Sequence, residues 1–192
     1  MPEEAGSPAP VKMTFFQRIK EIFAPTSASE VPDLRPNARP MVIGHDGQPR
    51  QPRILFVDAG NISRSIMAEV IAPKYGLFAE SSGTFPNKAI PQEIFDVMAE
   101  AGYDMSASRP KIFDVKRLEA FDRVIVMGTK IPKTYPAPQN LEEWTIPDPQ
   151  GMPLSFCRDV RTGMENKIRH LARQFTYKQK HKKGRTIVTI QN

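Results

Sequence analysis

Cysteine is almost absent from this sequence, since Cys157 is the one cysteine among 192 residues. No intrachain disulfide can therefore form, which suits a reducing compartment. Long apolar runs are also missing, because no stretch approaches the roughly 18 apolar residues of a membrane-spanning helix. The N-terminus lacks the apolar centre of a secretory signal peptide. These absences predict a cytoplasmic protein, or one that is peripheral to a membrane or part of a larger assembly.

Acidic residues are missing from the C-terminal tail, residues 177–192. The net charge of the chain is +6, and the run 178–185 holds five basic residues and no acidic one, which leaves +1 for the rest of the chain. This run is either a solvated tail or a surface that binds nucleic acid, acidic lipid or an acidic protein. Residues 186–190 alternate and are β-branched, so they predict a strand that pairs with a partner or with the protein's own sheet.

Residues 1–52 predict a proline-rich arm that precedes the folded domain. Within it, residues 14–23 predict a short amphipathic helix, because Thr14 and Gln17 form a capping box. A helix of this length is not stable alone, so its apolar face should dock. Its partner is the protein's own core, another protein or a membrane surface. The apolar face consists of Phe15, Phe16, Ile19, Ile22 and Phe23.

Strand and helix patterns alternate over residues 53–176, which predicts an α/β domain. The expected fold is a three-layer sandwich with a central parallel four-stranded sheet and extended arms at both ends. The expected strands are 54–57, 78–81, 123–127 and 144–146. One expected helix begins near Ser65, and three others cover residues 91–101, 114–120 and 155–175.

The loop from Asp58 to Ser65 leaves a buried strand and enters a helix, where α/β sheets bind anions. Gly60 permits a tight turn in which backbone N–H groups point inward. Arg64 supplies a fork that matches phosphate oxygens, and Asn61 is expected to bond to the loop's own backbone. An ordinary turn is the alternative. The predicted phosphate ligands are Ala59, Gly60, Asn61, Ile62, Ser63 and Arg64.

The same loop resembles the C-x-G-N-x-x-R-S loop of low-molecular-weight protein tyrosine phosphatases, with Asp58 in place of the cysteine. Three further segments resemble that family in the same order. Residues 81–84 resemble its Ser-Ala-Gly-Thr strand end, 121–127 its Asp-Leu-Val-Leu-x-Met strand, and 146–149 the loop that carries its general acid. The resemblance covers about residues 53–175 and implies a phosphatase-I or flavodoxin-like topology, which the arsenate reductases share.

The resemblance also implies roles for individual residues. In the family, a thiolate at position 58 attacks phosphorus, and Arg64 and the loop amides hold the phosphoryl oxygens. Ser65 donates to the thiolate, and Asp148 protonates the leaving group. The family uses no metal, and no cofactor is expected. Related arsenate reductases relay electrons through several cysteines, which Cys157 alone cannot do; a lone helical cysteine is more often a core residue.

Aspartate at position 58 removes the nucleophile and places a negative charge beneath a bound dianion. Asp58 is either ionised and bonded to Arg64 or the loop amides, or protonated when an anion binds, which would make a pH-dependent phosphate sensor. The favoured hypothesis is a pseudophosphatase that binds a phosphorylated ligand or acts as a scaffold. One alternative is an active phosphatase, through an atypical mechanism or because position 58 is engineered. The other is a structural subunit with a vestigial pocket.

Overall fold

The computed structural model describes residues 39–131, 140–176, 178–182 and 185–189, with side chains up to residue 176. The predicted helix 14–23 lies outside the described residues.

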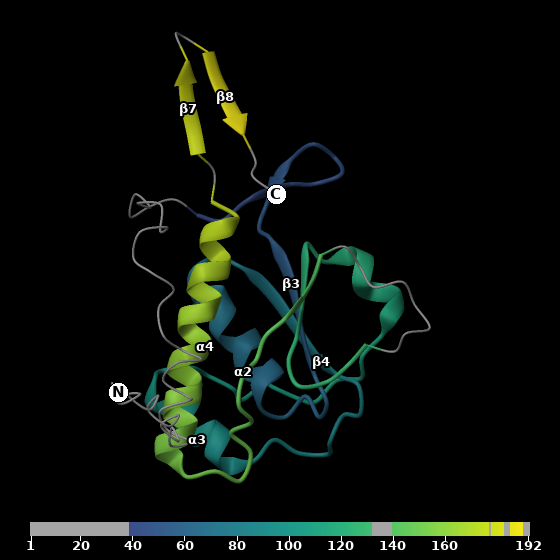
Figure 1. Ribbon diagram of the computed structural model, residues 1–192, viewed down its shortest axis with the longest axis vertical. Helices are drawn as coiled ribbons and strands as arrows, with labels where there is room; N and C mark the ends of the chain where they lie inside the picture. The colour runs from purple at the N-terminus through teal and green to yellow at the C-terminus, as the bar shows by residue number, and fades with distance from the viewer. Residues whose placement is uncertain (1–38, 132–139, 177, 183–184, 190–192) are drawn as a thin grey trace, which may run out of the picture. The chain divides into compact units, whose positions relative to one another are not determined.

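A four-stranded parallel sheet forms the centre of the domain, as the sequence predicts (Figure 1). The strands lie in the order β4-β3-β5-β6. The register places Asp58 beside Gly83 and Val57 beside Val126. The carboxyl ends of β3, β4 and β5 therefore meet at one edge of the sheet. The strands are β3 (Arg53–Asp58), β4 (Phe78–Gly83), β5 (Arg123–Val126) and β6 (Leu141–Glu143).

Three α-helices accompany the sheet in the described part of the chain: α2 (Arg64–Ile71), α3 (Gln92–Glu100) and α4 (Leu154–Gln174). Helix α4 contacts both α2 and α3. Pro73 shortens the helix that begins near Ser65, because proline disrupts the last turn of an α-helix: α2 ends at Ile71 and continues as the 3-10 helix η2 (Ala72–Tyr75).

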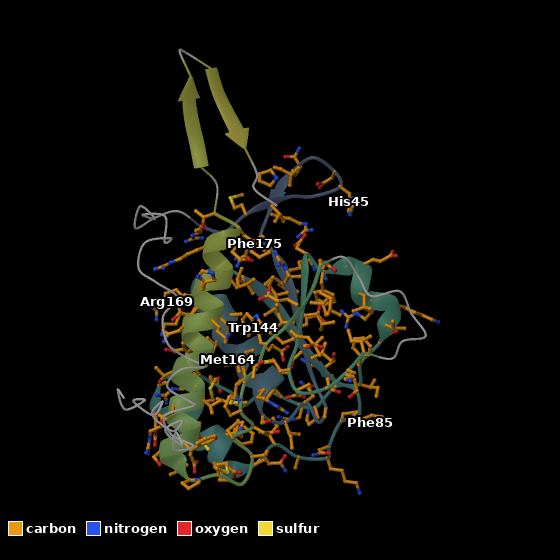
Figure 2. All side chains as sticks on the ribbon, viewed as in Figure 1. His45, Phe85, Trp144, Met164, Arg169 and Phe175 are labelled. Atoms are coloured by element: carbon orange, nitrogen blue, oxygen red, sulfur yellow. The ribbon has the colours of Figure 1, made fainter. Side chains whose placement is uncertain are left out.

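The two faces of the sheet pack against different elements, which gives the three layers. On one face, Leu55 and Val57 join a buried cluster with Leu118, which lies on the 3-10 helix η3 (Val115–Ala120). Strand side chains alternate, so Phe56 points the other way, and its ring lies 5.9 Å from that of Trp144. Trp144 also lies against α4, since the Lys167 ammonium is 5.6 Å from its ring centre (Figure 2).

Two sequence-based elements need correction. The predicted strand 144–146 is wrong: the fourth strand is β6, Leu141–Glu143. Among the described strands, β6 pairs only with β5, and β5 ends at Val126 opposite Glu143, so the ladder stops there. The sequence pattern does not predict β6, because two of its three residues are acidic and an edge strand needs no apolar alternation. The predicted helix 114–120 is a 3-10 helix that begins at Val115, where the Asp114 carboxylate accepts from the Lys116 amide.

The end of the predicted arm is attached to the domain. A short antiparallel pair, β1 (Val42–Ile43) with β2 (Pro49–Arg50), precedes the sheet. The Arg50 guanidinium makes a two-point ion pair with Asp122 at 2.7 and 2.9 Å. After α4, β7 (Lys178–Lys182) and β8 (Arg185–Thr189) form an antiparallel pair that includes part of the predicted strand 186–190. No helix in the described ranges has the length and hydropathy needed to cross a bilayer.

Candidate functional site

The loop between β3 and α2 has a backbone conformation that its surroundings impose. Asn61 has a φ of 51°, the one positive value for a non-glycine residue in the described part of the chain. Asparagine tolerates this left-handed conformation better than most residues. The loop carbonyls are anchored, because those of Asp58, Ala59 and Gly60 accept hydrogen bonds of 3.1, 2.8 and 2.9 Å from the backbone after β4. The donors are the amides of Thr84, Phe85 and Asn87.

Gly83 lets the end of β4 approach this loop closely. A Cβ atom at Gly83 would lie 2.8 Å from the Ala59 carbonyl oxygen and 2.9 Å from the Asn61 nitrogen. Both are backbone atoms of the loop, which cannot move aside as a flexible side chain can. The Gly83 position is therefore open to glycine alone unless the loop shifts.

The Asp58 carboxylate lies inside the loop and is 1% exposed. One oxygen accepts from the Asn61 amide at 2.6 Å and the other from the Ser65 amide at 3.0 Å. Of the two bonding partners expected for an ionised Asp58, the structure shows the loop amides and not Arg64. Burial raises the pKa of Asp58, although the hydrogen bonds from Ser65 and Asn61 and the charge of Arg64 oppose that shift.

Five other N–H groups of the loop donate to no acceptor among the described residues. Unpaired backbone donors are uncommon away from water, and a row of them beside a helix N-terminus can bind an oxyanion. The residues that carry them are Ala59, Gly60, Ile62, Ser63 and Arg64.

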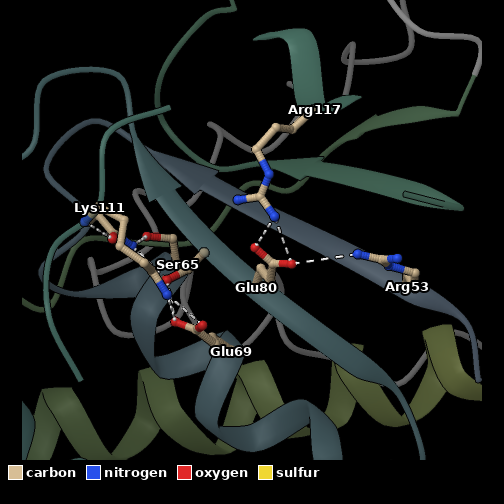
Figure 3. A network of polar contacts seen from close by, with 8 residues as sticks. Arg53, Ser65, Glu69, Glu80, Lys111 and Arg117 are labelled. Carbon is tan, nitrogen blue, oxygen red and sulfur yellow. Dashed lines mark hydrogen bonds and ion pairs between the residues drawn. The ribbon is translucent and has the colours of Figure 1, made fainter. Parts of the chain in front are cut away.

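The side chain of Asn61 joins the loop to two neighbouring segments. Its Nδ2 donates to the hydroxyls of Ser65 at 2.9 Å and Ser81 at 2.7 Å, and its Oδ1 accepts from the Lys111 amide at 2.7 Å. The expectation that Asn61 bonds to the loop's own backbone is wrong for its side chain. Glu69 completes the network, since it accepts from the Ser81 hydroxyl at 2.6 Å and from the Lys111 ammonium at 2.6 and 2.8 Å (Figure 3). These side-chain contacts stabilise the left-handed backbone conformation of Asn61.

Arg64 is the first residue of α2, and its guanidinium meets the loop after β6. Its Nη2 pairs with Asp148 Oδ2 at 2.8 Å, and its Nη1 lies 3.4 Å from the Ile146 carbonyl. Asp148 Oδ1 also accepts from the Ser63 hydroxyl at 3.0 Å and from the Gln150 amide at 3.1 Å. The structure thus brings together the two residues predicted to hold and protonate a phosphate ester, as an ion pair with each other.

Gly128 lies beside this guanidinium, directly after β5 and Met127. Its φ is +65°, and a Cβ atom there would lie 2.4 Å from Arg64 Nη1. Gly128 also borders a pocket of about 360 Å³ at the ends of β5 and β6. The other residues of that pocket are Val126, Thr129, Lys130, Glu143, Trp144, Thr145 and Ile146.

Cys157 is buried in α4 and lies close to the loop that carries Asp148. Its thiol donates to the carbonyls of Pro149 at 3.3 Å and Met152 at 3.4 Å. Burial, followed by the charge of Glu93, raises its pKa. A thiol with a raised pKa is a poor nucleophile at neutral pH, so Cys157 is a packing and anchoring residue for this loop.

Sequence reasoning missed three residues of this site. Gly128 had a usable signal, because it follows a buried parallel strand, and ligands bind at the carboxyl ends of such strands. Lys111 and Glu69 had none, since each acts through a neighbour that only the folded chain supplies.

The chain is similar to phosphatases and arsenate reductases. The family described as "Low molecular weight phosphotyrosine protein phosphatase" matches residues 53–183. A putative arsenate reductase from Halobacterium salinarum is 27% identical over 95 residues, which are 50% of this chain and 67% of that protein. The YwlE arginine phosphatase from Geobacillus stearothermophilus is 26% identical, with a TM-score of 0.56 over 63% of this chain and 90% of its own. An arsenate reductase in a phosphate-binding state is 26% identical, with a TM-score of 0.57 over 65% and 99%.

Proposed function

Because this chain belongs to the low molecular weight phosphotyrosine protein phosphatase family, we propose that it is a pseudophosphatase. It binds a phosphate group or a phosphorylated ligand at the loop 58–65 and does not hydrolyse phosphate esters at the rate of an active member. Its role is that of a binding or scaffold subunit.

The buried Asp58 carboxylate is the observation that carries this proposal. Its two oxygens accept hydrogen bonds from the amides of Asn61 and Ser65 at 2.6 and 3.0 Å. The family resemblance places the attacking thiolate at this position. A carboxylate is a weaker nucleophile than a thiolate, and aspartyl-phosphate formation elsewhere relies on a metal to offset charge. In the described ranges, no group of three or more His, Cys, Asp or Glu side chains could hold a metal.

Retained binding is supported by what surrounds Asp58. Five loop amides have no acceptor among the described residues, and Arg64 supplies a guanidinium whose Nε is buried without a hydrogen-bond partner there. Unpaired donors of this kind are uncommon in protein interiors and favour a site that binds an anion. A related arsenate reductase is described in a phosphate-binding state. We therefore expect the loop 58–65 to accept a tetrahedral oxyanion.

The affinity for sulfate is expected to rise as the pH falls from about 8 to about 5. An anion above an ionised Asp58 meets a like charge, so binding is coupled to proton uptake by that carboxyl. Because burial raises the pKa of Asp58, protonation occurs at a higher pH than for an exposed aspartate. The uptake of one proton limits the rise to about tenfold per pH unit. Sulfate is the suitable probe because its own charge is constant over this range, and titration calorimetry measures its affinity.

Asp58→Asn is the matched control for this experiment. The amide cannot ionise, so the variant should bind sulfate at neutral pH at least as tightly as the wild type does at low pH, with little pH dependence. A wild-type affinity that does not change with pH would show that Asp58 does not compete with the anion. If neither protein binds sulfate, the pocket is vestigial and the structural-subunit alternative holds.

A further inference from the structure

We propose that Gly128 is a positioning residue: it makes room for the Arg64 guanidinium beside Asp148, so that an oxyanion in the loop must take Arg64 from Asp148. This inference rests on the proposed binding of an oxyanion and adds a residue that decides how tightly the anion binds.

The space for the guanidinium exists because residue 128 has no side chain. A Cβ atom there would lie 2.4 Å from Arg64 Nη1, 3.0 Å from Cζ and 3.2 Å from Nη2, so it would collide with the whole guanidinium. The backbone at Gly128 is well anchored, since the preceding amide of Met127 donates to the Val57 carbonyl at 2.8 Å. The Gly128 backbone would therefore stay in place, and the end of the long Arg64 side chain would move away from the added methyl group.

The contacts that hold Arg64 there are incomplete. The guanidinium has one short contact, 2.8 Å to Asp148, and one long contact, 3.4 Å to the Ile146 carbonyl. Its Nε is buried and has no hydrogen-bond partner among the described residues. The Asp148 side chain is 43% exposed, and ion pairs with such an exposed partner are weak. An oxyanion that offers several oxygens can therefore compete for Arg64.

Asp148 itself is well held in the absence of Arg64. The Ser63 hydroxyl and the Gln150 amide both donate to its Oδ1, so the carboxylate has partners on the loop 58–65 and on its own turn. Releasing Arg64 leaves Asp148 with its hydrogen bond to Ser63 of the loop 58–65. The two states differ mainly in which acceptor the guanidinium meets, which is the condition for a competition.

Gly128→Ala tests the inference while it preserves every charge. We expect sulfate to bind about fivefold more tightly, because the anion no longer competes with a preformed ion pair of modest strength. Gly102→Ala is the matched control. Its φ of +77° imposes the same left-handed backbone on alanine, yet nothing lies within 4 Å of its Cβ position. The Gly102→Ala variant should bind sulfate with the affinity of the wild type.

Asp148→Asn should tighten sulfate binding at least as much, since it removes both the competitor and a nearby negative charge. Gly128→Ala added to Asp148→Asn should then change the affinity little, because the two substitutions remove the same contact. An additive effect would contradict the inference. So would a loss of affinity in Gly128→Ala, because the observed position of Arg64 would then be the one that binds the anion.

The ¹⁵N resonance of Arg64 Nε tests the positioning without any anion. It should shift in Gly128→Ala and in Asp148→Asn and stay in place in Gly102→Ala. An unshifted resonance in both test variants overturns the role of Gly128. Failure of the wild type and Asp58→Asn to bind sulfate, together with these shifts, would overturn the proposed function alone. If Gly128→Ala does not fold, the sulfate affinity of Asp148→Asn and its Arg64 Nε resonance test whether Asp148 competes with the anion for Arg64.

Discussion

Asp58→Cys is expected to hydrolyse p-nitrophenyl phosphate about 10³-fold faster than the wild type, or more. The amides of Asn61 and Ser65 that now bind the Asp58 carboxylate would face a thiolate and stabilise its charge, as would the adjacent helix N-terminus. Arg64 and the loop amides would hold the phosphoryl group, and Asp148 lies close enough to Arg64 to act on a leaving oxygen. Under the proposed function, the substitution therefore supplies the nucleophile that the site lacks.

The measurement compares steady-state turnover of the wild type, Asp58→Cys and Asp58→Ser. The serine variant matches cysteine in size but supplies no thiolate at neutral pH, so it should remain inactive. Adding Asp148→Asn to Asp58→Cys should lower turnover again by about 10²-fold or more if Asp148 is the acid. Turnover by the wild type that Asp58→Ala abolishes would refute the pseudophosphatase proposal. An Asp58→Cys variant that binds phosphate and stays inactive would place a second defect elsewhere in the site.

Gly83→Ala is expected to lower the free energy of unfolding by about 2–3 kcal/mol and to weaken sulfate binding strongly. The added methyl group would lie 2.8 Å from the Ala59 oxygen, 2.9 Å from the Asn61 nitrogen and 3.0 Å from the Asn61 Cβ. Relief requires the loop to move away from β4, and the amides that face the anion move with it. The loss of binding and the loss of stability thus have one cause.

Ser82→Ala, at the neighbouring position of β4, is the control for Gly83→Ala. Ser82 is 6% exposed, and its hydroxyl has no hydrogen-bond partner among the described residues. Removing that hydroxyl should be neutral or slightly stabilising. Chemical denaturation gives the stabilities, and calorimetry with sulfate gives the affinities. Equal values for Gly83→Ala and the wild type would mean that the loop adjusts without cost.

The predicted fold and the predicted loop agree with the structure where the signal is local. Strand β3 is an apolar run, and Pro73 ends α2 where proline chemistry requires it. Core positions followed the helical period in α3 and α4: Ile94, Val97 and Met98 are buried, as are Val160, Met164 and Ile168. Strand β6 was missed because an acidic edge strand is stabilised by its neighbour and not by its own pattern.

The hydrogen-bond partners of the site residues were beyond sequence reasoning for a different reason. Ser63 and Asp148 are 85 residues apart along the chain, and Asn61 and Lys111 are 50 apart. Nothing in the pattern near Asn61 indicates that its amide would meet Ser65, Ser81 and Lys111 rather than the loop backbone. The Arg64 guanidinium likewise meets Asp148 and lies beside Gly128, which are both distant in the sequence.

The sequence by itself determined the α/β class, the position of the loop and the identity of the group at its base. These follow from local periodicity, from the order of strand, loop and helix over residues 53–71, and from the chemistry of a carboxylate at position 58. Only the tertiary structure decided which donors hold Asp58, which acceptor holds Arg64 and why residue 128 has no side chain. Those features depend on atoms that parallel strand pairing brings to one edge of the sheet from distant parts of the chain.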